Sequence, residues 1–388
     1  MNIHIIGQKG IPSIGGGVEK HVEMLATRLV RRGNNVTIYT RSTYTAKNKT
    51  SYKGVNLISL PSMKKKHLEA ISHTFLACLH LITQKPDIIH FHSIGPSSLI
   101  WLARVLKPRT KIIATFHCQD YYHQKWGFLA RTYLRFGEFV ACTLPNKTIT
   151  VSKGLARYAK KTYNTDAIYI PNGVELMQSK NAHAIKKKWG LTKDSYILSV
   201  SRLIEHKGIH FLINAYNLLK TDKKLVIVGA SSYTNEYVTY LKKIAQKNPN
   251  IIFTNNQTGS NLVELFSNAY LFVQPSTSEG LSIALLESLA SKNTVLVSNI
   301  PENREAVLNN GFYFENKNVP SMKKQLDYLL KKPKLVKKYK EKGKQVVEEN
   351  YDWDKITDKT ERLYKNILTK QKYNIINFKT KNMMSKAL

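Results

Sequence analysis

Short runs of apolar, mostly β-branched residues alternate with longer amphipathic segments along the whole chain. This alternation is typical of βαβ units built around parallel sheets. In the first half, the pattern predicts strands at Ile3–Ile6, Val36–Tyr39, Ile88–Phe91, Lys111–Phe116 and Thr148–Val151. In the second half, it predicts strands at Tyr196–Val200, Lys224–Val228, Ile251–Thr254, Leu271–Gln274 and Thr294–Ser298. Each half is therefore expected to form its own doubly wound α/β domain.

The boundary between the halves is expected at the segment YIPNGVE, residues 169–175, where Pro, Asn and Gly interrupt the pattern. A lysine-rich polar stretch at 179–188 follows and is read as a linker. We accordingly divide the chain into a first domain, 1–172, a second domain, 173–352, a helix, 353–370, and a basic flexible tail, 371–388. A lysine-rich helix is also expected beyond Pro333.

Composition and charge limit the class of protein. The chain has 388 residues, of which 42% are apolar and 22% charged, as in a folded globular protein. Lys and Arg total 60 against 26 Asp and Glu, for a net charge of +34, which predicts an acidic partner such as nucleic acid, anionic lipid or a phosphorylated ligand. The three cysteines are widely spaced and suggest neither a disulfide framework nor a zinc site. With no secretory signal and no long apolar run, we expect a cytoplasmic protein.

The first strand leads into a glycine-rich loop, GQKGIPSIGGGVEKHVEML, and then a helix that is expected to begin near Gly17. Glycines let the backbone take positive φ and approach a ligand, and free amides at a helix start favour an anion. A plain tight turn or a dinucleotide site would have a similar loop. However, the spacing is not G-x-G-x-x-G, and Thr40 and Arg41 stand where a ribose-binding acid would follow the second strand. Both features argue against a dehydrogenase.

In the second half, SRLIEHKG places Arg202 and Lys207 between a strand and a helix. Ligands of open α/β sheets bind at these carboxyl ends of strands. The two cations could clamp a diphosphate. Arg202 would bind it through two parallel hydrogen bonds, and Lys207 would act as a point charge. The alternative is that both are ordinary solvated cations in a lysine-rich protein.

Glu279 and Glu287 frame the segment STSEGLSIALLE, which is expected to enter a helix near Gly280. Free amides at that helix start would favour an anion. At 1.5 Å per residue the two carboxylates would lie roughly 12 Å apart along the axis, so they cannot act as one tight pair. Glu279 could touch a sugar at the helix start, and Glu287 could accept hydrogen bonds from a ribose. The alternative is one favourable acid at the start of the helix and one solvated acid two turns later.

Two further motifs look like metal sites. The DWD segment, Asp352 to Asp354, is interpreted as the start and cap of the last helix rather than as a metal-binding D-x-D. The HFH segment, His90 to His92, is interpreted as the wall of a site or as core, because no third ligand is in view.

Taken together, the motifs resemble the retaining GT-B glycosyltransferases of family 4. The resemblance covers nearly the whole chain, since GGGVEKHV, ATFH, SRLIEHKG and PSTSEGLSIALLE occur in the family's order. The Glu-x7-Glu signature combined with the upstream Arg and Lys is its specific part. The segments GQKGIPSIGGGVEKHVE and HCQDYYHQKWG are similar to a bacterial, rhamnosyltransferase-like subgroup that serves surface polysaccharides. The resemblance implies two Rossmann-like domains facing a cleft, with the C-terminal helix crossing back to the first domain.

The resemblance also implies roles for the candidate residues. Arg202 and Lys207 would hold the diphosphate and stabilise charge on the leaving phosphate, so neither a metal nor another cofactor is expected. Glu287 would bind the ribose and Glu279 the donor sugar. The other implied site residues are Gly280 and Leu281, whose amides complete the phosphate site, Gly16 and Gly17, which let the first domain close, and His117, beside the reacting carbon of the donor sugar.

The chain departs from the family pattern at two places. Asn255 stands where many relatives have Gly, which bears on recognition of the base, and Lys292 and Asn293 stand where a Gly is common before a strand, which bears on a turn. Family members retain configuration by attack on the face that the phosphate leaves, the phosphate helping to take the acceptor proton. No protein base is therefore named.

The expected function is transfer of a sugar from a nucleotide diphosphate sugar to a growing, lipid-linked bacterial surface glycan. The segments KKKHLEAISHTFLACLHLI and QKWGFLARTYLRFGEFV mix cations with apolar residues at near-helical spacing. They suit peripheral docking on an anionic membrane at the inner face of the cell membrane, or they simply cover the sheet. A nucleotide-sugar 2-epimerase of the same fold is the alternative enzyme. A nucleic-acid binder is a distant third, because no RNA or DNA motif accompanies the charge.

Overall fold

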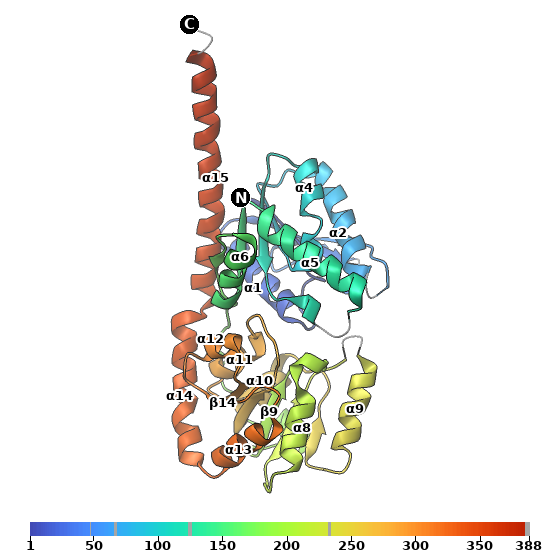
Figure 1. Ribbon diagram of the computed structural model, residues 1–388, viewed down its shortest axis with the longest axis vertical. Helices are drawn as coiled ribbons and strands as arrows, with labels where there is room; N and C mark the ends of the chain where they lie inside the picture. Colours follow the sequence, from blue (N-terminus) through green and yellow to red (C-terminus); the bar gives the residue numbers. More distant parts are fainter. Residues whose placement is uncertain (47, 66–67, 123–125, 232–233, 385–388) are drawn as a thin grey trace.

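The computed structural model describes residues 1–384 except 47, 66–67, 123–125 and 232–233, and from residue 370 on it describes the backbone alone. Two α/β domains lie one against the other, and the last helix runs along the first domain and projects past it (Figure 1). The expected fold class, two Rossmann-like domains, is confirmed.

The first domain is built on a sheet of order β3-β4-β2-β1-β5-β6-β7-β8. All neighbouring strands are parallel except β3 and β4. The strands are β1 (Asn2–Ile6), β2 (Asn35–Arg41), β3 (Ser51–Tyr52), β4 (Val55–Leu60), β5 (Ile88–His92), β6 (Lys111–Phe116), β7 (Lys147–Thr150) and β8 (Ile168–Tyr169). The helices are α1 (Gly17–Arg31), α2 (Glu69–His80), α3 (Ile94–Ser97), α4 (Ile100–Leu106), α5 (Phe128–Thr143) and α6 (Lys153–Tyr163), with short 3-10 turns η1 (Leu81–Thr83) and η2 (Asp120–Tyr122).

The second domain has a parallel sheet of order β11-β10-β9-β12-β13-β14. Its strands are β9 (Tyr196–Val200), β10 (Lys224–Val228), β11 (Ile251–Phe253), β12 (Leu271–Gln274), β13 (Val295–Ser298) and β14 (Phe312–Phe314). Its helices are α7 (Ala184–Trp189), α8 (Ile209–Asn217), α9 (Asn235–Ala245), α10 (Gly259–Ser267), α11 (Ile283–Ala290), α12 (Pro301–Val307), α13 (Val319–Leu330) and α14 (Pro333–Asn350), with the turn η3 (Glu205–Lys207).

Helices cover both faces of each sheet, which is why the central strands read as nearly continuous apolar runs. Ile3 and Ile5 of β1 are fully buried in a cluster that also contains residues of α1 and the last helix. Ile6 and Phe91 pack in a separate cluster with residues of α2, α4 and α5. The two sheet faces thus have separate cores, and the loops at the strand ends remain free to build a site.

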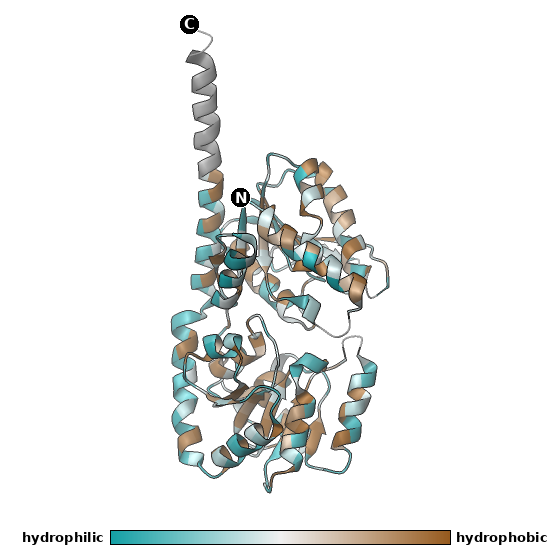
Figure 2. Cartoon of the chain, in the orientation of Figure 1, coloured by the Kyte–Doolittle hydropathy of each residue, from teal (hydrophilic) through white to brown (hydrophobic). Residues whose placement is uncertain are grey.

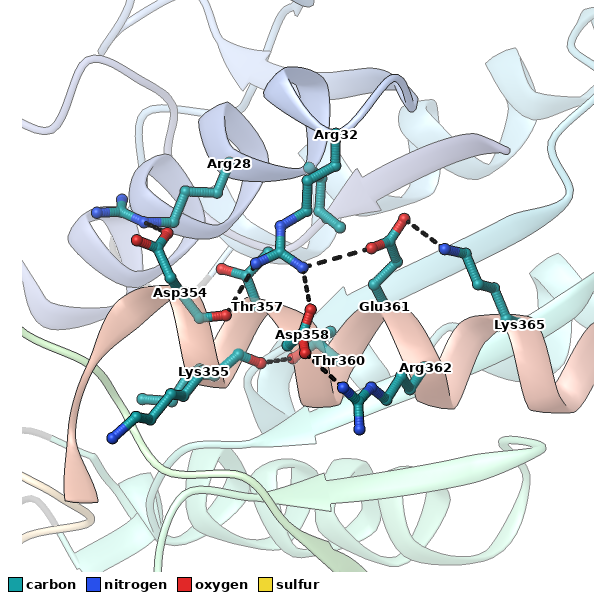
Figure 3. Close-up of polar contacts among 12 residues, drawn as sticks. Arg28, Arg32, Asp354, Lys355, Thr357, Asp358, Thr360, Glu361, Arg362 and Lys365 are labelled. Carbon is teal, nitrogen blue, oxygen red and sulfur yellow. Dashed lines mark hydrogen bonds and ion pairs between the residues drawn. The ribbon is translucent and has the colours of Figure 1, made fainter. Parts of the chain in front are cut away.

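The chain returns to the first domain through α15 (Trp353–Met384), as the family resemblance implied. Arg28 of α1 binds Asp354 of α15, with Nε 3.1 Å from Oδ1 (Figure 3). It also binds Glu175, with Nη2 2.7 Å from Oε1. Arg32 pairs with Asp358 and Glu361 one and two turns further along α15. These contacts join α15 to α1 along one side of the first domain.

All ten predicted strands are present, within a residue or two of their predicted ends. The pattern missed β3, β4, β8 and β14, which lie at or near the sheet edges and are mostly too short to show a period. The predicted linker 179–188 is wrong in part, because α7 begins inside it at Ala184. Helix α15 continues to Met384 instead of ending at residue 370, so residues 371–384 are helical, whereas 385–388 lie outside the described residues.

Within the described part of the chain, no helix is both long enough and apolar enough to span a membrane.

Candidate functional site

The candidate residues gather where the two sheets present the carboxyl ends of their central strands. In the first sheet the strand order reverses between β1 and β5, and in the second between β9 and β12. Loops diverge at such switch points and leave room for a ligand. The glycine-rich loop follows β1, His117 follows β6, Arg202 and Lys207 follow β9, and Glu279 follows β12. Chain topology thus brings together residues that are far apart in sequence.

Gly16 and Gly17 lie at the start of α1, as predicted. Gly16 has φ +106°, a conformation that L side chains rarely adopt, and no side chain caps the helix start. A Cβ on Gly17 would lie 3.7 Å from Ile283 Cδ1 of α11, so the loop already contacts the second domain. Asn256 strengthens this contact by donating from Nδ2 to the carbonyl oxygen of Ile14 at 3.1 Å.

Lys207 and Glu279 form a nearly buried ion pair, with Nζ 2.5 Å from Oε1 and side chains that are 13% and 8% exposed. The reading of Lys207 as a solvated cation is therefore wrong. The Arg202 side chain is exposed, and the positive charges of Arg202 and Lys207 both act on the Cys118 thiol beside His117. Burial nevertheless raises the pKa of that thiol well above its usual value. The two cations therefore face the first domain across the site.

The helix expected near Gly280 begins three residues later, with Ser282 as its N-cap, whose hydroxyl accepts from the amide of Leu285. Glu279, Gly280 and Leu281 consequently belong to the loop after β12, because Ser282 satisfies the helix start itself. A Cβ on Gly280 would lie 1.8 Å from the carbonyl oxygen of His117, so this loop contacts the first domain directly.

Glu287 lies on α11 and is partly buried. Burial raises the pKa of its carboxyl to about 7, and the positive charge of Lys20 on α1 partly offsets this rise. An acid with this pKa is easily ionised by ligand groups that donate hydrogen bonds to it. It is not the solvated acid of the alternative reading.

His117 lies in a cluster of three buried histidines. His92 Nδ1 is 3.0 Å from His117 Nε2, and the ring of His21 lies 5.0 Å from that of His117. His21 Nδ1 is 2.9 Å from Asn172 Oδ1, and Asn172 Nδ2 donates to the carbonyl oxygen of Leu281 at 2.8 Å. The statement that HFH has no third ligand in view is therefore wrong for His92, because two further imidazoles converge on it. His90 lies beside it in the core and contacts Tyr364.

The other metal-like motif behaves as predicted. Asp352 Oδ1 accepts from the amide of Lys355 at 2.9 Å and so caps α15, while Asp354 binds Arg28. The DWD segment is thus used for capping and for joining α15 to α1.

Both departures from the family pattern fall at positive φ. Asn255 has φ 58° and Lys292 has φ 60°. Glycine adopts this region at no steric cost and Asn tolerates it, whereas Lys is strained there. The positions therefore keep the backbone that glycine would have, and Lys292 does sit in a turn, directly after α11.

The structure brings all nine predicted site residues to the facing loops and helices of the two domains. It adds four residues that the sequence analysis did not assign to the site: Lys20, His21, Asn172 and Asn256. It also places His92, which was interpreted as the wall of a site or as core, beside His117. The sequence analysis used Asn172 only as one of the residues that interrupt the pattern at the domain boundary. Its two amide atoms in fact connect His21 to the Leu281 loop, and no local pattern signals such a contact.

Comparison with known sequence families gives two matches that together span most of the chain. The family described as Glycosyl transferases group 1 matches residues 181–346. The family described as Glycosyltransferase Family 4 matches residues 15–178. The break between the two matches lies close to the predicted domain boundary.

Three curated relatives illustrate the range of similar proteins. An uncharacterized glycosyltransferase of Methanocaldococcus jannaschii is 26% identical, over 94% of this chain and 98% of its own. The alpha-monoglucosyldiacylglycerol synthase of Streptococcus pneumoniae is 28% identical, over 78% of this chain and 72% of its own. A Campylobacter jejuni enzyme that adds N-acetylgalactosamine to a diphospho-undecaprenol-linked sugar is 33% identical, over 39% of this chain and 42% of its own.

Solved structures share the fold. Sucrose-phosphate synthase from Thermosynechococcus elongatus superposes with a TM-score of 0.83 at 18% identity, covering 95% of this chain and 99% of its own. The Anabaena protein HepE, solved with UDP-glucose, superposes with a TM-score of 0.79 at 15% identity, covering 94% of this chain and 100% of its own. At these identities the likeness is one of fold alone.

Proposed function

We propose that this chain, a glycosyltransferase of the GT-B fold whose halves match group 1 and family 4, transfers a sugar from a nucleotide diphosphate sugar to a growing bacterial surface glycan. The observation that carries the proposal is the meeting of the Lys207–Glu279 pair and the Gly280 loop with His117 at the carboxyl ends of both sheets. This arrangement supports a site in which cations hold a diphosphate, Glu279 and His117 contact a sugar, and the partly buried Glu287 binds a ribose.

Each residue then has a physical task. Arg202 and Lys207 bind the diphosphate and stabilise the charge that develops on it as the glycosidic bond breaks. The amides of Gly280 and Leu281 add hydrogen bonds to the phosphates, and Gly16 and Gly17 allow the first domain to approach them. Glu287 accepts hydrogen bonds from the ribose, and Glu279 and His117 contact the donor sugar.

We further propose that transfer retains the configuration of the donor and needs no metal. Two cations at the diphosphate can supply the charge that a divalent ion supplies elsewhere. Activity is then expected to persist in EDTA, and NMR of the product should show the anomeric configuration of the donor.

The proposed acceptor is lipid-linked, and the first domain would hold the enzyme at an anionic membrane as a peripheral, cytoplasmic protein. Helices α2, α4 and α5 lie together and carry apolar segments (Figure 2). Phe128 and Leu129 at the start of α5 are 82% and 83% exposed, and Val105 of α4 is 69% exposed. Exposed Arg131 and Arg135 follow these two residues on α5. Large exposed apolar side chains beside cations are typical of interfacial helices.

The first test is thermal stabilisation by UDP, GDP, dTDP and CMP, each with EDTA, in the wild type and in Glu287→Ala. A ligand that binds only the folded state raises stability by RT ln(1 + [L]/Kd). We expect one nucleoside diphosphate to stabilise the wild type and to stabilise the variant far less. Equal shifts in both proteins, or none, would remove Glu287 from the donor site.

The alternatives have distinct readouts. A 2-epimerase would convert its nucleotide sugar without an acceptor and without a change in mass. A nucleic-acid binder would bind any polyanion with a steep salt dependence.

A further inference from the structure

We propose that His21, His92 and His117 form a binding site for a divalent cation that prefers imidazole ligands, with Zn²⁺ as the representative ion. One ring nitrogen from each residue lies within 4.8 Å of those of the other two. The three residues come from α1, the end of β5 and the loop after β6, so topology alone brings them together. All three residues belong to the first domain, and the site uses neither Arg202 nor Lys207.

The three side chains already have the form that a metal needs. Their exposed fractions are 4%, 0% and 6%, so the surrounding protein holds all three rings in place. A metal ion binds the neutral form of imidazole, which is the major form of a free imidazole at pH 7. Imidazole nitrogens suit Zn²⁺, Cu²⁺ and Ni²⁺ rather than Mg²⁺ or Ca²⁺.

Asn172 orients the first ligand. Its Nδ2 donates to the carbonyl oxygen of Leu281, so its Oδ1 faces His21 Nδ1 and accepts a hydrogen bond from it. His21 Nε2 is then left with a lone pair. An outer partner that fixes the tautomer in this way is the usual arrangement around a metal-bound histidine.

His92 and His117 form a hydrogen-bonded pair in the cluster. His92 Nδ1 lies 3.0 Å from His117 Nε2, so one of these nitrogens donates a hydrogen bond to the other. If that proton moves to the far nitrogen of its own ring, both facing nitrogens have a lone pair for a metal ion.

The geometry needs only a small adjustment. Ligand nitrogens around tetrahedral Zn²⁺ lie about 3.4 Å apart, given bonds of about 2.0–2.1 Å. The His92–His117 separation of 3.0 Å is already close to this value, and the separations to His21, which are at most 4.8 Å, have to shorten by up to about 1.4 Å. If His117 contacts the donor sugar, a consequence that rests on the proposed function, then the ion and the sugar compete and Zn²⁺ inhibits.

The test uses full-length protein without a histidine tag and metal alone, with no nucleotide, so that it is independent of the proposed function. Co²⁺ should give the intense visible bands of four-coordinate nitrogen ligation, and one equivalent of Zn²⁺ should remove them. We expect His21→Gln, His92→Gln and His117→Gln each to weaken Zn²⁺ binding at least 100-fold. Asn172→Ala should weaken it about 10-fold, as losing an outer partner does.

The matched control is His73→Gln, which alters a fully buried histidine of α2 that is outside the cluster. It should change Zn²⁺ affinity less than threefold. Binding that survives the three cluster substitutions, or a weak octahedral Co²⁺ spectrum in the wild type, would overturn the proposal. The wild-type spectrum decides the matter even if a cluster variant fails to fold.

Discussion

Lys207 Nζ lies 2.5 Å from Glu279 Oε1, and this pair joins the loop after β9 to the loop after β12 at the switch point of the second sheet. The two residues are 72 positions apart. In the proposed reaction, Lys207 binds the diphosphate and Glu279 contacts the donor sugar. The ion pair therefore holds both groups in place before the donor binds, so less side-chain ordering is needed on binding.

Removing Lys207 should affect both stability and catalysis. Lys207→Met leaves the Glu279 carboxylate nearly buried without its cation, which should lower the free energy of unfolding by about 3 kcal/mol. It should also lower kcat about 100-fold, since one preorganised group that stabilises charge is lost. Urea unfolding and initial rates measure the two effects. The control is Lys344→Met, which breaks an exposed pair with Glu348 and should cost less than about 0.5 kcal/mol. Equal losses in both variants would contradict the structural role of the pair.

The raised pKa of Glu287 predicts that the stability of the folded protein depends on pH. The unfolded chain ionises this group near 4.5 and the folded chain near 7, so the folded state holds the extra proton between these values. Stability should therefore fall as pH rises from about 4.5 to about 7, by on the order of 3 kcal/mol. Glu287→Gln should lack this decline. Denaturant titrations of both proteins at several pH values give the difference, and parallel curves would exclude the raised pKa.

The raised pKa of Glu287 also predicts that nucleotide affinity rises with pH, whereas stability falls. Ribose hydroxyls donate to the ionised carboxylate, so affinity should rise by up to about tenfold per pH unit as pH increases towards 7 and then level off. Calorimetry in buffers with different ionisation heats should show a proton released on binding below pH 7. Glu287→Gln should bind weakly at every pH and release none.

Gly280 tests the approach of the two domains. Its Cβ would lie 1.8 Å from the His117 carbonyl oxygen, so Gly280→Ala must push the loop after β12 away from the first domain. A misplacement of about 1 Å at a reacting centre can cost about 100-fold in rate, which is the expected loss of kcat/KM. Gly154→Ala is the control, because its Cβ would meet only Ser152 Oγ at 3.8 Å. Unchanged kinetics in Gly280→Ala would show that the reacting arrangement does not need this contact.

Arg28 tests the docking of α15. Its side chain is 9% exposed, binds Asp354 and Glu175, and lies over the ring of Trp353 with Cζ 5.8 Å from the centroid. Arg28→Ala should lower the free energy of unfolding by about 1–2 kcal/mol, less than for a fully buried pair because both acids are exposed. Arg362→Ala, which removes an exposed guanidinium from Asp358 of the same helix, should lower the free energy of unfolding much less than Arg28→Ala does. Chemical denaturation of both variants checks this, and a reversed order would contradict it.

The membrane proposal depends on Phe128 and Leu129. Full burial of such side chains is worth about 1.5–3 kcal/mol each, so Phe128→Ser with Leu129→Ser should weaken binding to anionic liposomes roughly 100-fold or more. Binding should also fall between 0.05 and 0.5 M salt, roughly, because the Debye length shortens. Co-sedimentation measures both effects. Leu218→Ser changes a side chain of the second domain that is 62% exposed and should have no effect. If the wild type, the double variant and Leu218→Ser bind liposomes equally, Phe128 and Leu129 of α5 have no role in membrane binding.

Much of the fold could be read from local patterns. The central strands are buried on both faces, so their apolar runs are continuous and their limits are marked by turn residues. The edge strands β3 and β8 have two residues each and carry no such signal. The helix at Gly280 was placed too early, since glycine next to small polar residues does not reveal which of them is the cap.

By itself, the sequence determined the two α/β halves, their order, and the motifs that name Arg202, Lys207, Glu279, Glu287 and His117, because each depends on residues close together in the chain. Only the tertiary structure decided that Lys207 and Glu279 pair, that Asn172 joins His21 to Leu281, and that three imidazoles meet. These contacts join residues that are tens to more than a hundred positions apart, and they arise from strand order and domain contact. The pKa of Glu287 belongs with them, because burial is a property of the folded surroundings and not of the residue.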